Sequence, residues 1–170
     1  MPSKALIRSY TDSDRDAARR LWSELTEHHR QLYQDPELGG PSPGLEFDNY
    51  LLREERVATW VAVLDDEVVG LAGLLDHGDS GEVEPVITAE PVRRKGIGRD
   101  LLGTAIEEAR RRHFLYLAIR PVARNVDAIS AFHAEGFRTL GGHLDLTLDL
   151  AVRKHQWHHG ATLHGLDFDY

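Results

Sequence analysis

Three strand-like segments follow one another between Arg56 and Thr88 without room for a helix between them. The first two, residues 57–64 and 68–75, are rich in β-branched and apolar side chains, and a pair of aspartates separates them. This pattern predicts an antiparallel hairpin. A polar, glycine-containing turn then leads into a third strand that begins at Glu82. Strands that succeed one another without intervening helices exclude a purely parallel, doubly wound sheet.

Helical patterns flank this run on both sides. Apolar residues recur at three- and four-residue spacing within residues 12–29, and again from Pro91 to the basic run at 110–112, where cations suit the helix dipole. The order of elements predicts an α+β fold, layered α/β/α, with a mixed, mainly antiparallel central sheet and helices on both faces. The remaining expected elements are a first strand over 5–10, a short helix near 47–52, a buried strand over 114–119, a helix over 125–136 and last strands over 137–150.

A chain of 170 residues fits one domain with a single core. We assign that domain to residues 1–150 and expect residues 151–170 to form a C-terminal extension. The extension mixes charges with aromatic side chains, among them Trp157, Phe168 and Tyr170, which a free tail would leave exposed. We therefore expect the extension to pack on its own domain or on a second subunit, as in a homodimer.

Composition narrows the classes of function. The absence of cysteine excludes disulfides, thiolate metal sites and a cysteine nucleophile. A formal net charge of −8 argues against nucleic acid as the main partner, because phosphate backbones are bound mostly by Lys and Arg. Neither a signal peptide's apolar run nor a membrane span is evident, so a cytoplasmic protein without membrane contact is expected. The ten histidines lack the spacing of a zinc site, and no metal is expected.

A basic, glycine-containing segment marks the junction between the third strand and the helix that follows. Backbone N–H groups at a helix start lack intrahelical partners, and the helix dipole adds partial positive charge there. Two glycines remove the Cβ atoms that would keep an anion away from these amides. The segment therefore predicts a cradle for a phosphate or pyrophosphate group. Its residues are Arg93, Arg94, Lys95, Gly96, Ile97 and Gly98.

Two other phosphate-binding motifs fit this segment less well. A dinucleotide fingerprint requires glycine where Leu101 stands, and a parallel sheet before it. A P-loop requires a Gly-Lys-Ser or Gly-Lys-Thr run, which the chain lacks. A basic helix start that binds nothing is the remaining alternative, and the segment alone leaves it open.

The surroundings of the cradle resemble a known family. Residues 86–102, VITAEPVRRKGIGRDLL, are similar to the acetyl-CoA signature of the GNAT family of N-acetyltransferases. Residues 125–137, NVDAISAFHAEGF, look like its second landmark, an asparagine-capped helix that ends in Gly-Phe. The resemblance extends to the order of the strands up to about Leu150. It implies the family's fold, with splayed central strands, and acetyl transfer from acetyl-CoA to an amine.

The resemblance also assigns cofactor-binding roles. The family pairs the strand before the cradle with the pantetheine arm of coenzyme A, which maps to Val86, Ile87 and Thr88. Residues 93–98 map to the pyrophosphate site, and Asn125 maps to a hydrogen-bond partner of the arm or the thioester. Asn125 is also a good helix cap, and one role does not exclude the other.

Acetylation by direct attack requires a neutral amine. An alkylamine with a pKa of ~10.4 is mostly protonated at pH 7, a handicap of roughly 4 to 5 kcal/mol that a carboxylate base offsets in part. Side chains alternate along a strand, which places Glu82 and Glu84 on one face of the strand that leads to the cradle. The family often places its base on that strand, so one of the two is a candidate base. The alternative is that both merely line a solvated face.

The proton donor to the leaving thiolate is where the sequence departs from the family. Many members have tyrosine four residues before the Gly-Phe pair, and this chain has Phe132. His133 is the neighbouring candidate acid, although adjacent helix residues point about 100° apart. Solvent or a tail residue is the other option, and a catalytically weak acyl-CoA sensor or subunit stays an alternative function. The acceptor is expected to be a small-molecule amine or a protein amino group, bound in a pocket built from the first two helices, the loop at 35–44 and the C-terminal strands.

Overall fold

The computed structural model describes residues 4–141, 161–163 and 166–168. Five strands form one mixed sheet in the order β1-β2-β3-β4-β5, in which only β4 and β5 run parallel. The strands are β1 (Leu6–Ser9), β2 (Arg56–Leu64), β3 (Glu67–Asp76), β4 (Ser80–Thr88) and β5 (Tyr116–Ile119). A separate two-stranded pair, β6 (Ala161–Leu163) and β7 (Leu166–Phe168), is antiparallel.

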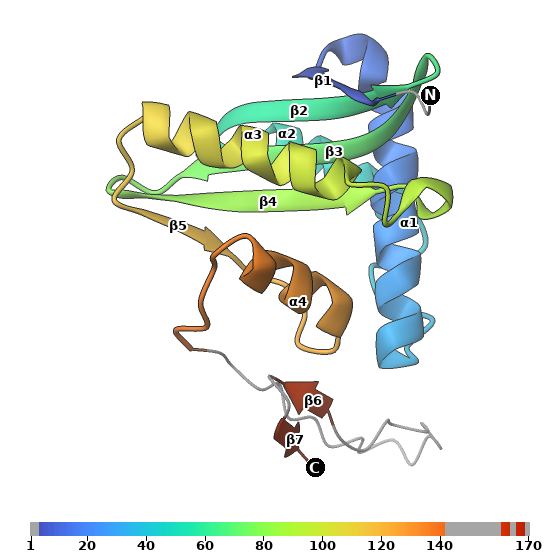
Figure 1. Cartoon of the computed structure of the whole chain (residues 1–170). Coiled ribbons are helices and arrows are strands. Elements are labelled where there is room, and N and C mark those ends of the chain that lie inside the picture. The colour runs from blue at the N-terminus through green and yellow to red at the C-terminus, as the bar shows by residue number, and fades with distance from the viewer. Residues whose placement is uncertain (1–3, 142–160, 164–165, 169–170) are drawn as a thin grey trace.

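Helices cover both faces of this sheet, which confirms the predicted fold class (Figure 1). On one face lie α1 (Arg15–Tyr33) and α2 (Glu46–Leu51), and α3 (Ile97–Arg111) lies across the other. A fourth helix, α4 (Val126–Ala134), follows β5. Short 3-10 turns at Asp12–Asp14, Pro43–Leu45 and Glu90–Val92 connect these elements. Within the described part of the chain, no helix combines the length and apolarity needed to cross a bilayer.

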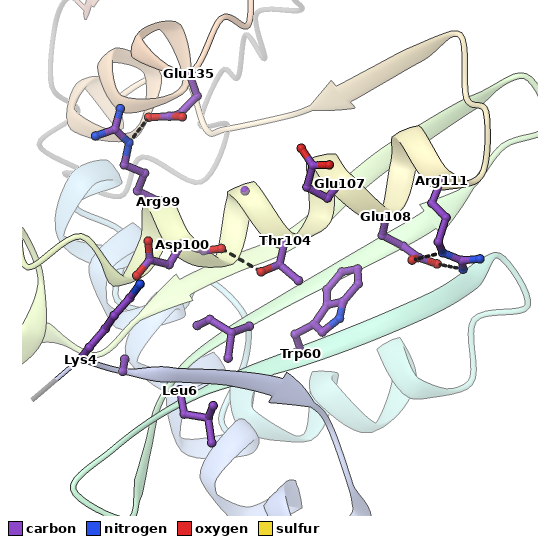
Figure 2. A pocket seen from close by; sticks show the side chains of 13 residues that line it. Lys4, Leu6, Trp60, Arg99, Asp100, Thr104, Glu107, Glu108, Arg111 and Glu135 are labelled. Carbon is purple, nitrogen blue, oxygen red and sulfur yellow. Dashed lines mark hydrogen bonds and ion pairs between the residues drawn. The ribbon is translucent and has the colours of Figure 1, made fainter.

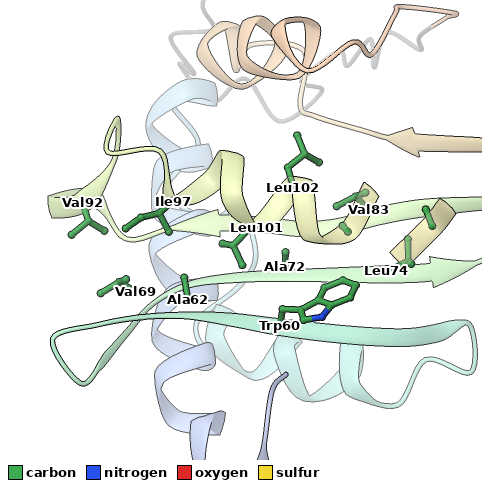
Figure 3. Close-up of a cluster of buried hydrophobic side chains, with 12 residues drawn as sticks. Trp60, Ala62, Val69, Ala72, Leu74, Val83, Val92, Ile97, Leu101 and Leu102 are labelled. Carbon is green, nitrogen blue, oxygen red and sulfur yellow. The ribbon is translucent and has the colours of Figure 1, made fainter. Parts of the chain in front are cut away.

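Each face of the sheet has its own hydrophobic cluster. Under α3, the buried residues Leu101 and Ala105 pack against Trp60, Ala72 and Leu74 (Figure 3). Small residues on β3 allow this close approach, since a Cβ on Gly70 would lie 2.8 Å from the Leu101 side chain. Burial of one large apolar side chain contributes roughly 1.5 to 3 kcal/mol, so these contacts fix α3, and with it the cradle, on the sheet. The cluster under α1 and α2 consists of Ala18, Leu21, Phe47, Tyr50, Val61, Leu71, Leu75 and Ile87.

A bulge interrupts the pairing of β3 with β4. Leu74 pairs with Val83 and Ala72 pairs with Val86, so β4 has one more residue than β3 over this interval. Opposite the bulge, Gly73 leaves space that the buried Tyr50 hydroxyl occupies, and a Cβ there would overlap it. Burial raises the pKa of Tyr50 to about 12, and its hydroxyl lies 3.1 Å from Thr59 Oγ1, so this phenol stays neutral.

The segment after α4 differs from the sequence prediction where it can be compared. Residues 137–141 are irregular rather than the start of a strand. The rest of the predicted last strands, residues 142–150, lies outside the described residues. Of the extension at 151–170, the structure describes only the backbone of β6 and β7, so the predicted packing of the extension also lies outside the described residues.

The junction between β1 and α1 contains a buried carboxylate. Asp14 is 4% exposed, and its two oxygens accept hydrogen bonds from Arg8 Nη1 at 2.7 Å and Nη2 at 2.8 Å. The Thr11 backbone N–H donates a further bond of 2.8 Å. Hydrogen bonding to Arg8 lowers the pKa of Asp14 to about 2, assisted by Thr11 and opposed by burial.

We expect Asp14→Asn to lower the free energy of unfolding near pH 7 by about 1 to 2 kcal/mol. This is less than the pKa shift alone implies, because the Arg8 side chain is partly exposed to screening solvent. The folded pKa is below the unfolded value of about 3.9, so this stabilisation exists above that value and disappears as the pH falls toward 2. Urea titrations of both proteins from pH 7 to pH 2 measure the effect.

The matched control is Asp12→Asn, since the Asp12 side chain is 88% exposed and also pairs with an arginine. Its effect should stay within about 0.5 kcal/mol. A difference between wild type and Asp14→Asn that did not shrink on acidification would contradict this account of the junction.

Candidate functional site

The start of α3 has the geometry of an anion cradle. Gly96 is the N-cap residue and has φ = +85°, a left-handed conformation that favours glycine. Among the described residues, no side chain caps this helix end, and Gly96 O accepts a backbone hydrogen bond from Asp100 N–H at 3.0 Å. The first amides of α3 are therefore available to an anion, with the positive end of the helix dipole behind them.

The cradle is attached directly to the end of β4. Arg93 Nε donates a 3.2 Å hydrogen bond to the carbonyl oxygen of Thr88. Across the same junction, a Cβ on Gly98 would lie 3.2 Å from Thr88 Oγ1. The three cationic residues of the cradle therefore differ in role, since Arg93 folds back on the strand whereas Arg94 and Lys95 are exposed.

The backbone edge of β4 that leads to the cradle is open on one side. Val86, Ile87 and Thr88 pair with β3, but the parallel pairing with β5 covers only residues 80–83 of β4. Beyond that point β4 has no strand partner on its β5 side among the described residues. The second half of β4 can thus accept an extended chain through its backbone N–H and C=O groups.

Ion pairs hold α4 beside the cradle. Arg94 lies 3.6 Å from Asp127 in the first turn of α4, and Arg99 lies 2.6 Å from Glu135 at its C-terminal end. Asn125 Oδ1 accepts a 3.1 Å hydrogen bond from Ala128 N–H, which confirms its predicted role as a helix cap. Its role toward an acyl thioester stays a prediction.

The second half of α1 also reaches this region. The Glu90 N–H donates a 3.4 Å hydrogen bond to Glu24 Oε2. Burial lowers the pKa of His28, and the positive charge of Arg93 lowers it further. His28 is therefore mostly neutral at pH 7, and it adds no cation to the cradle.

The two candidate bases lie in different surroundings. Glu82 is 7% exposed, and its Oε2 lies 3.0 Å from His77 Nε2 and forms an ion pair with Arg120. Glu84 is more exposed, and its Oε2 accepts a 2.8 Å hydrogen bond from Arg53 Nη1. Glu82 is thus enclosed by its partners, whereas Glu84 lies where the open part of β4 begins.

The guanidinium group of Arg120 lies close to this part of β4. The last pair of the parallel ladder is Val83 with Ile119, so Glu84 and Arg120 are the first residues beyond it on the two strands. The charge of Glu84 contributes to the raised pKa of Arg120, after the hydrogen bond and the charge of Glu82. The point at which β4 and β5 separate therefore combines two carboxylates with a guanidinium group.

The predicted acid, His133, and its neighbour Phe132 lie on α4. Phe132 packs on the cluster under α3, and its ring centroid lies 6.3 Å from that of Phe137. His133 Nε2 lies 3.2 Å from Thr139 Oγ1. No proton donor occupies the Phe132 position, and the assignment of His133 as an acid stays a prediction.

An open groove of about 1240 Å³ lies between β1 and α3 and extends to the Arg99–Glu135 ion pair next to the cradle (Figure 2). Trp60, Thr104 and Glu107 are among the residues that line it. None of the predicted cofactor or catalytic residues does so, and we therefore place the candidate site at the open edge of β4 instead. Among the described residues, no group of three or more His, Asp or Glu side chains could hold a metal ion.

Sequence reasoning missed Arg53 and Arg120. Arg53 directly follows the short α2 region, and nothing in its spacing connects it with Glu84, 31 residues later. Arg120 directly follows the strand that the sequence predicts as buried, and this was the available signal. The prediction of burial was wrong, because Tyr116 is exposed and the other residues of β5 are only half-buried. To place Arg120 beside Glu82 from this signal, one would also have to know that β4 and β5 are parallel and pair in the observed register.

The comparisons with known proteins agree with this geometry. The Acetyltransferase (GNAT) family matches over residues 15–137, while no curated protein matches the sequence at a significant level. A GNAT-family acetyltransferase from Staphylococcus aureus has a TM-score of 0.66 at 15% identity, covering 79% of this chain and 85% of that one.

Two further similar structures are described as ribosomal-protein-alanine N-acetyltransferases. The protein from Brucella melitensis has a TM-score of 0.65 at 28% identity, covering 80% of this chain and 86% of that chain. The Escherichia coli protein, described as acting on ribosomal protein S18, has a TM-score of 0.62 at 20% identity, covering 79% and 78%. The match over residues 15–137 includes both the cradle and the asparagine-capped helix, and the chain therefore belongs to the GNAT family of acetyltransferases.

Proposed function

We propose that this protein is an N-acetyltransferase that transfers the acetyl group of acetyl-CoA to a primary amine. The observation that supports this most is the continuity of two features: the open edge of β4 leads directly to the uncapped start of α3. An extended pantetheine arm fits the first feature, and a pyrophosphate fits the second. No phosphate-binding motif of another class competes for these residues.

The reaction is a direct attack. The amine nitrogen forms a bond to the thioester carbonyl carbon, the C–S bond breaks, and coenzyme A leaves as a thiolate that takes up a proton. The amine must first lose its own proton, because an ammonium group has no lone pair with which to attack. We propose Glu84 as the group that accepts this proton, directly or through a water molecule.

The choice of Glu84 over Glu82 rests on their contacts. Glu82 is enclosed and pairs with both His77 and Arg120, so an incoming amine would have to displace an existing partner. The Glu84 side chain is 43% exposed and has Arg53 on one oxygen. We assign Glu82 to holding Arg120 in place rather than to taking the proton.

The leaving thiolate takes its proton from solvent or from His133, since Phe132 has none to give. The same observation supports a second candidate function, an acyl-CoA-binding sensor or subunit with weak catalysis. The two differ in one measurement: an enzyme releases free thiol when amines are added, whereas a sensor binds acetyl-CoA without releasing it.

Acceptor identity is open between small-molecule amines and protein amino groups. Two similar structures are described as enzymes that acetylate an alanine of a ribosomal protein, which supports an α-amino group as the nucleophile. Both α-amino acids and protein N-termini carry such a group.

A charge placed at Gly98 tests the proposed pyrophosphate site. Gly98→Asp adds a negative charge at the amides that are proposed to hold the pyrophosphate, and we expect the Kd for acetyl-CoA to rise roughly tenfold or more. Gly103→Asp is the matched control, because it places the same charge in the same helix where a Cβ meets nothing within 4 Å. Isothermal titration calorimetry measures both.

Gly98 lies close to Thr88, so the fold of the Gly98→Asp variant must be checked by its thermal unfolding. Lys95→Glu provides a second variant at an exposed position and should weaken binding in the same direction. Equal affinities for wild type, Gly98→Asp and Lys95→Glu would show that the pyrophosphate binds elsewhere.

Replacement of the Glu84 carboxylate by an amide tests its proposed role as the base. Glu84→Gln should lower kcat/KM roughly 100-fold at pH 7. The loss should shrink as the pH approaches the pKa of the amine, where the acceptor is already neutral in solution. Initial rates of thiol release from pH 6 to pH 10 measure this profile, and Glu67→Gln, at the exposed start of β3, serves as control.

Arg53→Gln separates the carboxylate from its partner, because it removes the hydrogen bond to Glu84 but leaves the base in place. We expect it to change the pH profile without abolishing activity. A Glu84→Gln enzyme that stayed within about threefold of wild type at every pH would eliminate Glu84 as the base.

A further inference from the structure

A pair of opposite charges lies where the acceptor amine is expected to enter. Glu84 and Arg120 directly follow Val83 and Ile119, the last residues that pair between β4 and β5. Arg120 pairs with Glu82, which lies two residues before Glu84 on β4, and the charge of Glu84 also contributes to the raised pKa of Arg120, so the two groups lie within electrostatic reach of each other.

Arg120 has a partner within the protein and is otherwise exposed to solvent. Its Nη1 pairs with the buried carboxylate of Glu82, which in turn contacts His77. The side chain of Arg120 is nevertheless 68% exposed. A guanidinium group has five N–H donors in a planar fork, so its exposed part can bind another oxygen ligand while Glu82 keeps it in place.

Arg53 does not offer the same opportunity. Its Nη1 bonds to Glu84 and its Nε lies 3.8 Å from Glu55, and its side chain is 33% exposed. Both edges of that guanidinium group therefore face carboxylates of this chain. Of the two arginines near the candidate base, Arg120 is the one whose geometry suits a ligand.

We propose that Arg120 is a specificity-determining residue that binds the carboxylate of an α-amino acid acceptor. This inference rests on the proposed function and deepens it, because it names the substrate class. An α-amino acid carries its ammonium and carboxylate groups on one carbon, so it requires a negative and a positive partner side by side. Glu84 faces the ammonium group and Arg120 faces the carboxylate.

Arginine suits this role because its fork matches the two oxygens of a carboxylate. An amide carbonyl, as at a protein N-terminus, offers one neutral oxygen and gains less from the same contact. The proposal therefore favours a free amino acid over a protein N-terminus, and the difference can be measured.

The experiment compares three acceptors with the same side chain: leucine, leucinamide and 3-methylbutylamine. The other common amino acids and their amides are assayed in parallel, with thiol release as the readout. At least one amino acid should exceed both its amide and its decarboxylated amine at least tenfold in kcat/KM. Arg120→Gln should reduce that ratio to about threefold or less, mainly through KM, and Arg120→Lys should keep part of it.

Arg110→Gln is the matched control, since Arg110 is also an exposed arginine paired with a glutamate, but it lies in the last turn of α3, on the other face of the sheet from α1 and α2. Its preference should equal that of wild type. Because loss of Arg120 leaves Glu82 buried beside His77 alone, thermal unfolding of each variant is recorded, and Arg120→Lys preserves a cation for Glu82.

The inference is overturned if amides or plain amines reach the same kcat/KM as the corresponding amino acids. It is also overturned if Arg120→Gln keeps the wild-type preference for the amino acid over its amide. In either case thiol release still demonstrates an N-acetyltransferase, so the proposed function survives. If no amine in the panel releases thiol, the inference also fails, and calorimetry with acetyl-CoA then shows whether the proposed cofactor site fails with it.

Discussion

Backbone groups along the second half of β4 lack a strand partner on the β5 side within the described residues. Unpaired N–H and C=O groups are costly if buried, so such an edge must face water or a ligand that supplies the missing partners. The ladder stops after Val83 and Ile119, where the two strands diverge. The other features of the candidate site are arranged around that opening: the cradle follows the far end of β4, and α4 lies beside it (Figure 1). The charged residues Glu84 and Arg120 lie at its near end.

The cradle is positively charged, although the protein as a whole is negatively charged. The formal net charge is −8, yet residues 93–95 supply three consecutive cations at the helix start. At the near end of the opening, Glu82 and Glu84 are balanced by Arg120 and Arg53. One end is therefore suited to a pyrophosphate and the other to a polar acceptor with charges of both signs.

Local chemistry made much of this predictable from sequence. Gly96 and Gly98 mark an open helix start, Asn125 caps the next helix, and both signals depend only on neighbouring residues. The mixed sheet followed from three consecutive strands. Arg53 and Arg120 could not be found in this way, because their positions depend on strand register and on the packing of α2. Of the last strands expected over 137–150, the structure describes only residues 137–141, and these residues are irregular.

The central claim is that the open edge of β4 and the start of α3 together bind acetyl-CoA. Hydrogen–deuterium exchange measured with and without acetyl-CoA tests this claim most directly. The account predicts slower exchange in peptides that cover residues 84–98, and little change in residues 80–83, which β5 already pairs. Unchanged exchange across residues 84–98 at saturating acetyl-CoA, or protection confined to the groove between β1 and α3, would contradict it.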